Sequence, residues 1–479
     1  MKNIIFSILL VLISLNGYSQ TTEVLNWNKE KEFIRFDDTT VLIYYKNKLY
    51  TGVYEKYHFT GKLREKGSYL NGKETGVWEF YYDNGKLSSK GSYINGEKNG
   101  VWEWYLSNGQ LTSKGSYLNG DSTGVWLKYD GNGQLLWKGS YLNGDSTGVW
   151  LEYDGNGHLL LKGSYLNGRR NGVWLEYHYY GKTKLKYSYI NGKLNGVLLQ
   201  YDGNGQLEMK GSYLNGKEDG VWEGYHQNKQ LSWKRSYLNG KPNGVWEWYQ
   251  GNGQLYAKQS YINGKPNGVW ESHYDNGQLR MKGSYLNGDS TGVWLEYEDD
   301  GQLFWKRSYL NGKKNGVWEE YYRFNGNLSS KGSYLNGEKN GVWLEYYLYG
   351  KTKSKYSYIN GKPVDGIWEE YHEDGQLSSK GSYLNGEEDG IWEWYYSNGS
   401  LWKKGSYLNG KWNGVWEEYL DNGQLHSKRS YLNGKEDGVW EAYHLNGQPS
   451  SKGSYLNGKQ NGVWEYYGWD GRLYSTQTY

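Results

Sequence analysis

The sequence contains no cysteine and only four prolines among its 479 residues. Without cysteine the chain cannot form a disulfide, a thiolate metal site or a lipid-modified cysteine after a leader. Phenylalanine and methionine are also scarce, with 7 and 3 residues. The 55 basic and 52 acidic residues are interspersed, and their net charge of +3 provides no strong field for nucleic acid or anionic lipid. We therefore expect no nucleic-acid partner.

Glycine, tryptophan and tyrosine are abundant instead, with 70, 26 and 53 residues, and a sequence repeat accounts for them. The stretch from Gly76 to Asn99 reads GVWEFYYDNGKLSSKGSYINGEKN, and Gly100 begins the same phrase again. Further units follow at steps of 24 residues, with two steps of 25, as far as Gly462. Counting a first unit at Gly52, the chain has eighteen units, and we expect one elongated repeat domain.

Each unit contains two runs that are typical of β-strands. Residues 77–82 are rich in β-branched and aromatic side chains, and residues 86–94 alternate small, polar and apolar groups. Asn95-Gly96 follows, a pair that supplies the positive φ of tight hairpin turns. No apolar period of 3.6 residues persists. We predict an all-β fold with essentially no helix, an elongated antiparallel β-meander or solenoid in a single twisted sheet, with Gly72, Gly85 and Gly96 as structural turn residues.

The period of two in a strand sorts the side chains onto two faces. Val77 and Glu79 fall on one face and Trp78 and Phe80 on the other. Gly91 in the second strand leaves a gap into which a neighbouring ring can lean. The register between the strands stays open at this point. The two longer steps carry insertions, Arg323-Phe324 in a hairpin tip and Pro363-Val364 in what we interpret as an inter-unit turn.

The first residues differ from all the others. A positive residue precedes an apolar run from Ile4 to Leu15, and small residues follow, so residues 1–19 are predicted to be a secretory signal peptide. The run is shorter than the roughly 20 residues that span a bilayer, and we expect no transmembrane segment after cleavage. The predicted domains are this signal peptide, an N-terminal cap at 20–43, the repeat array at 44–467 and a C-terminal cap at 468–479. The predicted location is extracytoplasmic, either secreted or periplasmic.

The unit phrase Asn-Gly-x-x-x-Gly-Val-Trp-Glu-x-Tyr-x-x-Asn-Gly-Gln-Leu resembles the bacterial variant of the MORN repeat, including proteins named as YwqK-family toxin–antitoxin antitoxins. The likeness covers roughly residues 45–475. It implies β-hairpins stacked into a single elongated, twisted sheet with an aromatic-lined groove, and a role as a scaffold for protein assembly or in lipid contact. A secretory signal does not fit a cytosolic antitoxin, so the resemblance carries over the fold and the scaffold role.

The sequence shows no pattern that indicates a catalytic site. Serines such as Ser92 recur as ordinary repeat positions, without an activating base. Five of the eight histidines (His58, His178, His226, His372 and His444) occupy the same slot at least two units apart, too far to share a zinc ion. Rows of Glu at position 79 and its equivalents favour a solvated surface paired with lysine over a glycosidase pair. We expect no catalytic residue, no metal and no cofactor.

The tryptophan of the triplet is the candidate binding residue. Two interpretations stay open: the rings stack as the core of the sheet, or some of them remain exposed and bind a sugar or the apolar residues of a partner. The candidate surface comprises Trp78, Trp102, Trp126, Trp150, Trp174, Trp222, Trp246, Trp270, Trp294, Trp318, Trp343, Trp368, Trp392, Trp416, Trp440 and Trp464.

Three hypotheses for function follow. The first is a non-enzymatic secreted or periplasmic scaffold that binds a protein partner through an extended aromatic-rich β surface. The second is an adhesin that binds a glycan or the cell envelope through exposed Trp and Tyr rows. The third is an antitoxin-like neutralising protein.

Overall fold

The computed structural model describes residues 24–26, 35–37, 40–42, 44–45, 48–364 and 366–479. The described residues form strands and turns without a helix, which confirms the all-β prediction. No helix among them is therefore long and apolar enough to cross a bilayer. The predicted signal peptide lies outside the described residues, as does most of the predicted N-terminal cap.

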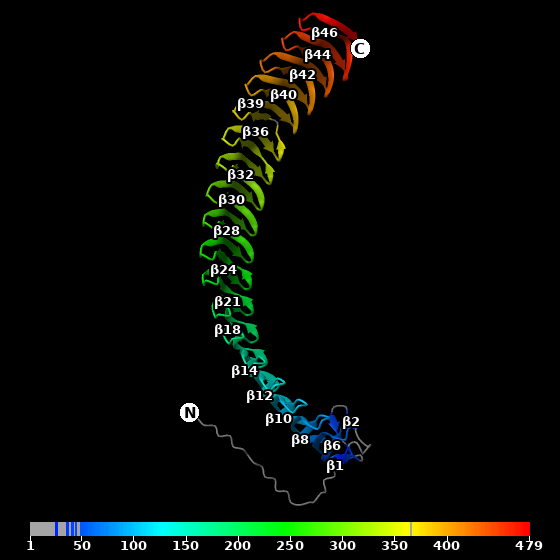
Figure 1. Cartoon of the computed structure of the whole chain (residues 1–479), viewed down its shortest axis with the longest axis vertical. Coiled ribbons are helices and arrows are strands. Elements are labelled where there is room, and N and C mark those ends of the chain that lie inside the picture. Colours follow the sequence, from blue (N-terminus) through cyan, green and yellow to red (C-terminus); the bar gives the residue numbers. More distant parts are fainter. Residues whose placement is uncertain (1–23, 27–34, 38–39, 43, 46–47, 365) are drawn as a thin grey trace, which may run out of the picture. The chain divides into compact units, whose positions relative to one another are not determined.

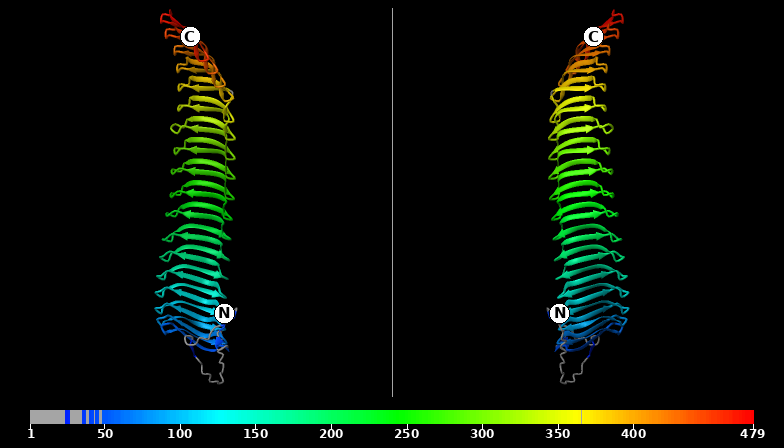
Figure 2. Two further views of the ribbon diagram at one scale, coloured as in Figure 1. Left: turned by 90° about the vertical axis from the view of Figure 1, so that its right-hand side faces the viewer. Right: turned by 90° about the vertical axis from the view of Figure 1, so that its left-hand side faces the viewer.

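Eighteen successive hairpins, from β6/β7 to β46/β47, are present in the described part of the chain and belong to one open sheet (Figure 1). Among the described strands of this sheet, neighbours in sequence pair antiparallel, and only β1 joins in parallel. The chain divides into two compact parts, Met1–Lys217 and Glu218–Tyr479. Within each of these two parts the strands lie side by side in a single layer (Figure 2).

The strands up to residue 217 are β1 (Val24–Asn26), β2 (Arg35–Asp37), β3 (Thr40–Leu42), β4 (Tyr44–Tyr45), β5 (Lys48–Leu49), β6 (Gly52–Tyr57), β7 (Leu63–Leu70), β8 (Lys73–Tyr81), β9 (Leu87–Ile94), β10 (Glu97–Tyr105), β11 (Leu111–Leu118), β12 (Asp121–Tyr129), β13 (Leu135–Leu142), β14 (Asp145–Tyr153), β15 (Leu159–Leu166), β16 (Arg169–Arg170), β17 (Gly172–Tyr177), β18 (Thr183–Ile190), β19 (Lys193–Leu194), β20 (Gly196–Tyr201) and β21 (Leu207–Leu214).

The remaining strands are β22 (Lys217–Glu218), β23 (Gly220–Tyr225), β24 (Leu231–Leu238), β25 (Lys241–Pro242), β26 (Gly244–Tyr249), β27 (Leu255–Ile262), β28 (Lys265–His273), β29 (Leu279–Leu286), β30 (Asp289–Tyr297), β31 (Leu303–Leu310), β32 (Lys313–Tyr321), β33 (Leu328–Leu335), β34 (Glu338–Lys339), β35 (Gly341–Tyr346), β36 (Thr352–Ile359), β37 (Lys362–Pro363), β38 (Gly366–Tyr371), β39 (Leu377–Leu384), β40 (Glu387–Tyr395), β41 (Leu401–Leu408), β42 (Lys411–Tyr419), β43 (Leu425–Leu432), β44 (Lys435–Tyr443), β45 (Pro449–Leu456), β46 (Lys459–Tyr467) and β47 (Leu473–Thr478).

Pairing within a hairpin fixes the two faces. In β8 and β9, Trp78 lies opposite Gly91, and Glu79 lies opposite Lys90. Directly opposite residues project from the same face of a sheet. We call the side of Trp78 and Gly91 the tryptophan face and the side of Glu79 and Lys90 the charged face, and the same names apply to equivalent residues in every unit.

The turns between units are two-residue hairpin loops. Ile94 pairs with Glu97 across Asn95-Gly96, whose φ angles are 53° and 86°. Positive φ at both central residues is the type I′ geometry, which Asn and Gly tolerate best. Gly72 and Gly85 also lie in turns, with φ of 76° and 85°. The local sequence therefore specifies where each strand reverses.

The Gly-Val-Trp triplet forms a bulge against the preceding hairpin. In β10, Asn99 pairs with Ser92 of β9, and the next pair joins Glu103 with Lys90. Three residues, Gly100 to Trp102, thus face Gly91 alone. Such a bulge bends the strand and re-aims its side chains, and it turns the ring of Trp102 onto Gly91.

The insertions lie in two different places. The Arg323-Phe324 insertion lengthens a hairpin tip as predicted, because the tip is closed by a hydrogen bond from Tyr322 N to Asn327 O. The interpretation of the second insertion was wrong. Pro363 keeps its regular pairing with Tyr358 beyond an ordinary Asn-Gly turn. Val364 N donates to Ser357 O as Asn340 N donates to Ser333 O in the preceding unit, so the inter-unit turn is not lengthened.

The two ends of the array differ. β1 pairs in parallel with β6 through Val24 and Val53, while the extent of the N-terminal cap stays a prediction. β47, within the predicted C-terminal cap, pairs with β46 as an ordinary second strand. The backbone of Tyr479 exchanges two hydrogen bonds with Gly462, so this end continues the repeat geometry.

Candidate functional site

The ring of Trp102 shows how each unit is packed. A Cβ placed on Gly91 would lie 2.1 Å from Cδ2 of this ring, so only glycine leaves room for it. The indole Nε1 donates to Ser92 O at 3.1 Å, and Tyr93 packs edge-on at 5.1 Å and 90°. Trp102 is 2% exposed. The triplet tryptophan thus forms a large part of the core of each unit, in a sheet whose described strands have no second layer over them.

The structure places the sixteen candidate tryptophans on the tryptophan face, one in each of sixteen repeat units. Ten of them are buried, and their rings offer little surface to a partner: Trp78, Trp102, Trp174, Trp222, Trp294, Trp318, Trp343, Trp392, Trp416 and Trp464. Six keep partial exposure: Trp126, Trp150, Trp246, Trp270, Trp368 and Trp440. A binding role for the tryptophans stays a prediction. Because the other ten rings are buried, the candidates for this role are these six.

Five of the tryptophans lie against a residue larger than glycine at the position equivalent to Gly91, which we call the glycine slot. Four of these tryptophans are partly exposed (246, 270, 368 and 440), whereas Trp318, against Arg307, is buried. Trp270 lies opposite Gln259, and Trp368 stacks on Tyr356 with centroids 4.5 Å apart and planes at 18°. Both tryptophans are only partly buried. A side chain in the slot therefore competes with the indole for one volume. The slot alone does not set the exposure, because Trp126 and Trp150 lie against Gly115 and Gly139 and are also partly exposed.

One unit exchanges the two partners. Leu198 replaces the tryptophan, and Tyr187 occupies the glycine slot opposite it. Tyr187 is buried and donates its hydroxyl to Glu176 Oε1 at 2.7 Å. Burial and this hydrogen bond raise the pKa of Tyr187 above its ordinary value. In this pair the aromatic ring therefore belongs to the residue in β18, and the aliphatic side chain belongs to the residue in β20.

The charged face carries a feature that the sequence interpretation missed. The Val or Ile of every triplet from Val77 to Val463 is 38–68% exposed, and the Leu or Ile before every Asn-Gly turn from Leu70 to Leu456 is 41–58% exposed. There are seventeen of each. Val77 pairs with Ser92, two residues from Ile94, so the two rows are adjacent. We call them together the aliphatic band. Their strict recurrence opposite the tryptophans was the available signal.

Beside the band, lysine and glutamate alternate from strand to strand. Glu103 lies 3.4 Å from Lys90 Nζ and 2.8 Å from Lys114 Nζ, and it accepts a hydrogen bond from the Tyr105 hydroxyl. The hydrogen bond from Lys114, followed by that from Tyr105, lowers the pKa of Glu103 from 4.5 to about 2. The predicted pairing of the glutamate row with lysine is confirmed here. Leucine interrupts the row at residues 127, 151, 175, 199, 295 and 344.

We expect the Glu103 ion pairs to stabilise β10 and β11 above pH 4.5 and to lose this effect as the pH falls towards 2. The pKa is depressed in the folded state, so protonation at low pH removes the interaction. The expected contribution is below about 1 kcal/mol because the lysines are exposed. Local hydrogen exchange, corrected for intrinsic rates, should show a smaller loss of protection on acidification in Glu103→Gln than in the wild type. Glu97→Gln, at an exposed residue, is the control, and equal pH dependence in Glu103→Gln and the wild type would contradict the prediction.

Sequence comparison agrees with this hairpin geometry. The MORN repeat variant family matches residues 50–71, 74–95, 98–119, 146–167, 194–215, 242–263, 266–287, 364–385, 388–409, 412–433 and 436–457, just over half of the chain. The chain belongs to the MORN repeat variant family. Each matched segment spans one hairpin of the MORN array. The finer likeness to YwqK-family antitoxins stays a prediction.

Other comparisons add no function to the MORN assignment. No curated protein matches the chain. Solved structures that match include the crystal structure of TcdB2-TccC3, at 13% identity and a TM-score of 0.15, with 89% of this chain and 28% of that chain covered. A Photorhabdus luminescens Tc holotoxin pore matches at 11% identity and a TM-score of 0.14, with 90% and 30% covered. The chain thus spans less than a third of the length of these proteins.

The residue at the start of the hairpin tip is histidine in five of the MORN units, where it links that tip to the next hairpin. His58 Nε2 lies 2.9 Å from Tyr81 O in the next hairpin and donates to it. The histidines at 178, 226, 372 and 444 make the same contact 23 residues on. Tyr82 occupies this position in another unit and donates to Tyr105 O at 2.7 Å. Within the residues described, no three His, Asp or Glu side chains group as metal ligands would.

Proposed function

We propose that this MORN array is a non-enzymatic extracytoplasmic scaffold that binds protein along the aliphatic band. The observation that carries the proposal is the half-exposed pair of aliphatic residues in seventeen units. Monomeric soluble proteins rarely expose apolar patches beyond a few hundred Å². Tryptophan burial already stabilises the sheet from the other face, so the band is available to a partner.

The chemistry of the band indicates the kind of partner. An extended segment with aliphatic side chains at regular intervals would bury them against the Val and Leu rows. The flanking lysines and glutamates would fix its register through complementary charges. Repetition also gives avidity, because each further unit engaged adds contacts without a new loss of translational freedom.

Site-specific photo-cross-linking in the native host tests the proposal. A photoreactive amino acid at Val173, in the band, should capture a discrete protein partner. The same amino acid at Tyr180, an exposed residue of the same unit outside the band, is the matched control and should capture little. Excess unmodified protein should suppress the Val173 product. Equal capture at both positions, or none at Val173, would contradict protein binding through the band.

The extracytoplasmic location rests on the predicted signal peptide. Mass spectrometry of the native protein should find a mature N-terminus close to residue 20, in an extracytoplasmic fraction. A cytoplasmic protein that retains residues 1–19 would overturn the proposed location, and it would favour the antitoxin-like alternative.

Glycan binding is the second candidate function. It is favoured by the six partly exposed tryptophans and, among them, by the environment of Trp150. That environment is distinct enough to specify a class of ligand.

A further inference from the structure

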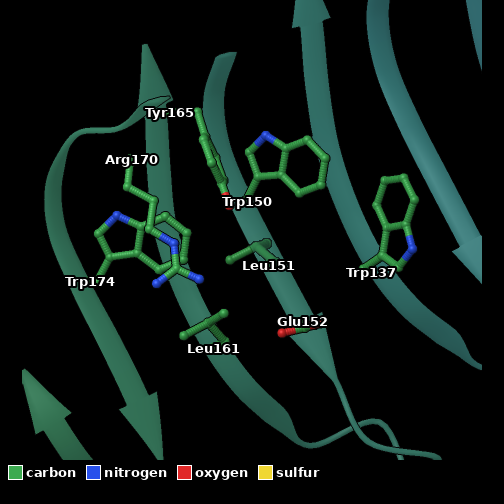
Figure 3. A pocket seen from close by; sticks show the side chains of 8 residues that line it. All are labelled: Trp137, Trp150, Leu151, Glu152, Leu161, Tyr165, Arg170 and Trp174. Carbon is green, nitrogen blue, oxygen red and sulfur yellow. The ribbon is translucent and has the colours of Figure 1, made fainter. Parts of the chain in front are cut away.

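We propose that a pocket on the tryptophan face, between Trp137 and Trp174, binds one pyranose ring of a neutral saccharide (Figure 3). The proposal deepens the second candidate function and is independent of protein binding by the aliphatic band. The pocket lies within strands β13 to β17, at a place where this unit departs from the repeat.

The departure is Trp137. Most of the other units place a small or aliphatic residue here, such as Ser89 or Ser113. Tryptophan also occurs at 233 and 305, but an arginine two residues later lays its guanidinium over the ring, at 4.5 Å for Arg235 and 4.3 Å for Arg307. After Trp137 the slot keeps Gly139, so no arginine covers its ring in this way.

Trp150 packs against Trp137, and its indole forms a different hydrogen bond from that of Trp126. The two indoles stack with centroids 5.2 Å apart and planes at 14°. Trp150 Nε1 donates to Thr147 O at 3.3 Å, whereas Trp126 Nε1 donates to Ser116 O in the usual way. The ring of Trp150 therefore has a different position from that of Trp126, and both rings keep part of their surface exposed.

Apolar groups complete the walls. Tyr165 lies edge-on to Trp150 at 5.3 Å, and the buried Trp174 lies beyond it. Leu161 also lines the pocket (Figure 3). The volume of about 220 Å³ is below the roughly 300–1,000 Å³ of sites for drug-sized ligands. A pocket of this volume suits a single pyranose ring.

Two charged groups stand at the rim without neutralising each other. Glu152 is exposed and, among the described residues, forms no ion pair with Arg170. The Arg170 guanidinium lies 4.3 Å over the Trp174 ring and donates to the Tyr189 hydroxyl at 3.3 Å. The rim thus offers a carboxylate that accepts hydrogen bonds and a guanidinium with donors to spare.

This combination selects a sugar over a protein side chain. A pyranose presents apolar C–H faces to aromatic rings and hydroxyls around its edge. Those hydroxyls can donate to Glu152 and accept from Arg170. A phenylalanine or leucine of a partner would displace water from both charged groups and return no hydrogen bond, which is unfavourable.

Ligand-observed NMR on the full chain tests the pocket. The probes are hexasaccharides of glucose, mannose and N-acetylglucosamine at about 10 mM, which would fill most of a site with a Kd of about 1 mM. At least one should receive saturation from the protein. Trp137→Ser, which restores the residue found at position 89, and Glu152→Gln should each weaken binding about tenfold or more. Trp233→Ser is the matched control and should bind as the wild type.

Three results would overturn the proposal: no saturation transfer to any probe, wild-type binding by Trp137→Ser, or displacement of the sugar by an aliphatic peptide. Circular dichroism of Trp137→Ser should match the wild type, which separates loss of the site from loss of the fold. Val173 lies on the opposite face, so its cross-linked product should persist in Trp137→Ser. Failure of the sugar site is then distinguishable from failure of the protein scaffold.

Discussion

Replacing Trp102 with alanine should be strongly destabilising for β9, β10 and β11, by about 3–5 kcal/mol. The ring is 2% exposed and fills the only space that Gly91 leaves open. Its removal opens a cavity that the sheet cannot close, because the described strands around it have no second layer that could move in. In a repeat array each unit contacts only its neighbours, so the loss should stay local. Hydrogen exchange resolved by strand is therefore the measurement, since a single global transition is not expected.

Trp402→Ala is the matched control for this prediction. Trp402 is 46% exposed, and its removal should change stability by no more than about 0.5 kcal/mol. Similar losses of protection around the two sites would contradict the view that triplet tryptophans form the core.

Gly381→Tyr alone should destabilise β39 and β40, and adding Trp392→Leu should restore much of the loss. A Cβ on Gly381 would lie 2.0 Å from the Trp392 ring, so the tyrosine collides with it. We expect about 1–3 kcal/mol for this overpacking. The double variant reproduces the Tyr187 and Leu198 pair, and Glu370 lies where Glu176 accepts the tyrosine hydroxyl.

A double-mutant cycle followed by hydrogen exchange should give a coupling of about 1–3 kcal/mol in favour of the double variant. The reverse exchange, Tyr187→Gly with Leu198→Trp, should also be tolerated, since it returns that unit to the common arrangement. Additive effects of Gly381→Tyr and Trp392→Leu would show that the two positions do not share one volume.

Much of the fold was predictable from short-range patterns. Asn95-Gly96 and its equivalents specify the turns because few residues adopt positive φ at both central positions. The alternation in residues 77–82 placed Trp78 and Glu79 on opposite faces, and the structure keeps that arrangement. Gly91 was correctly interpreted as room for a neighbouring ring. These features depend on residues close in sequence.

The candidate site was predictable only in part. The tryptophan row was identified, but its exposure was open, and the aliphatic band of Val77 and Ile94 was missed. Both faces carry apolar residues, so alternation alone does not tell which set is covered. Exposure depends on the bulge at Gly100 to Trp102, a matter of cross-strand register. The pocket at Trp150 depends on Trp137, which lies on the preceding strand.

The sequence by itself therefore determined the repeat, the strands, the turns and the membership of each face, because period and local conformational preference suffice for these. Only the tertiary structure decided which face of the sheet is its core. The reason is that three residues of one strand face a single glycine of its neighbour, which lays Trp102 flat on Gly91 and leaves Val101 in solvent.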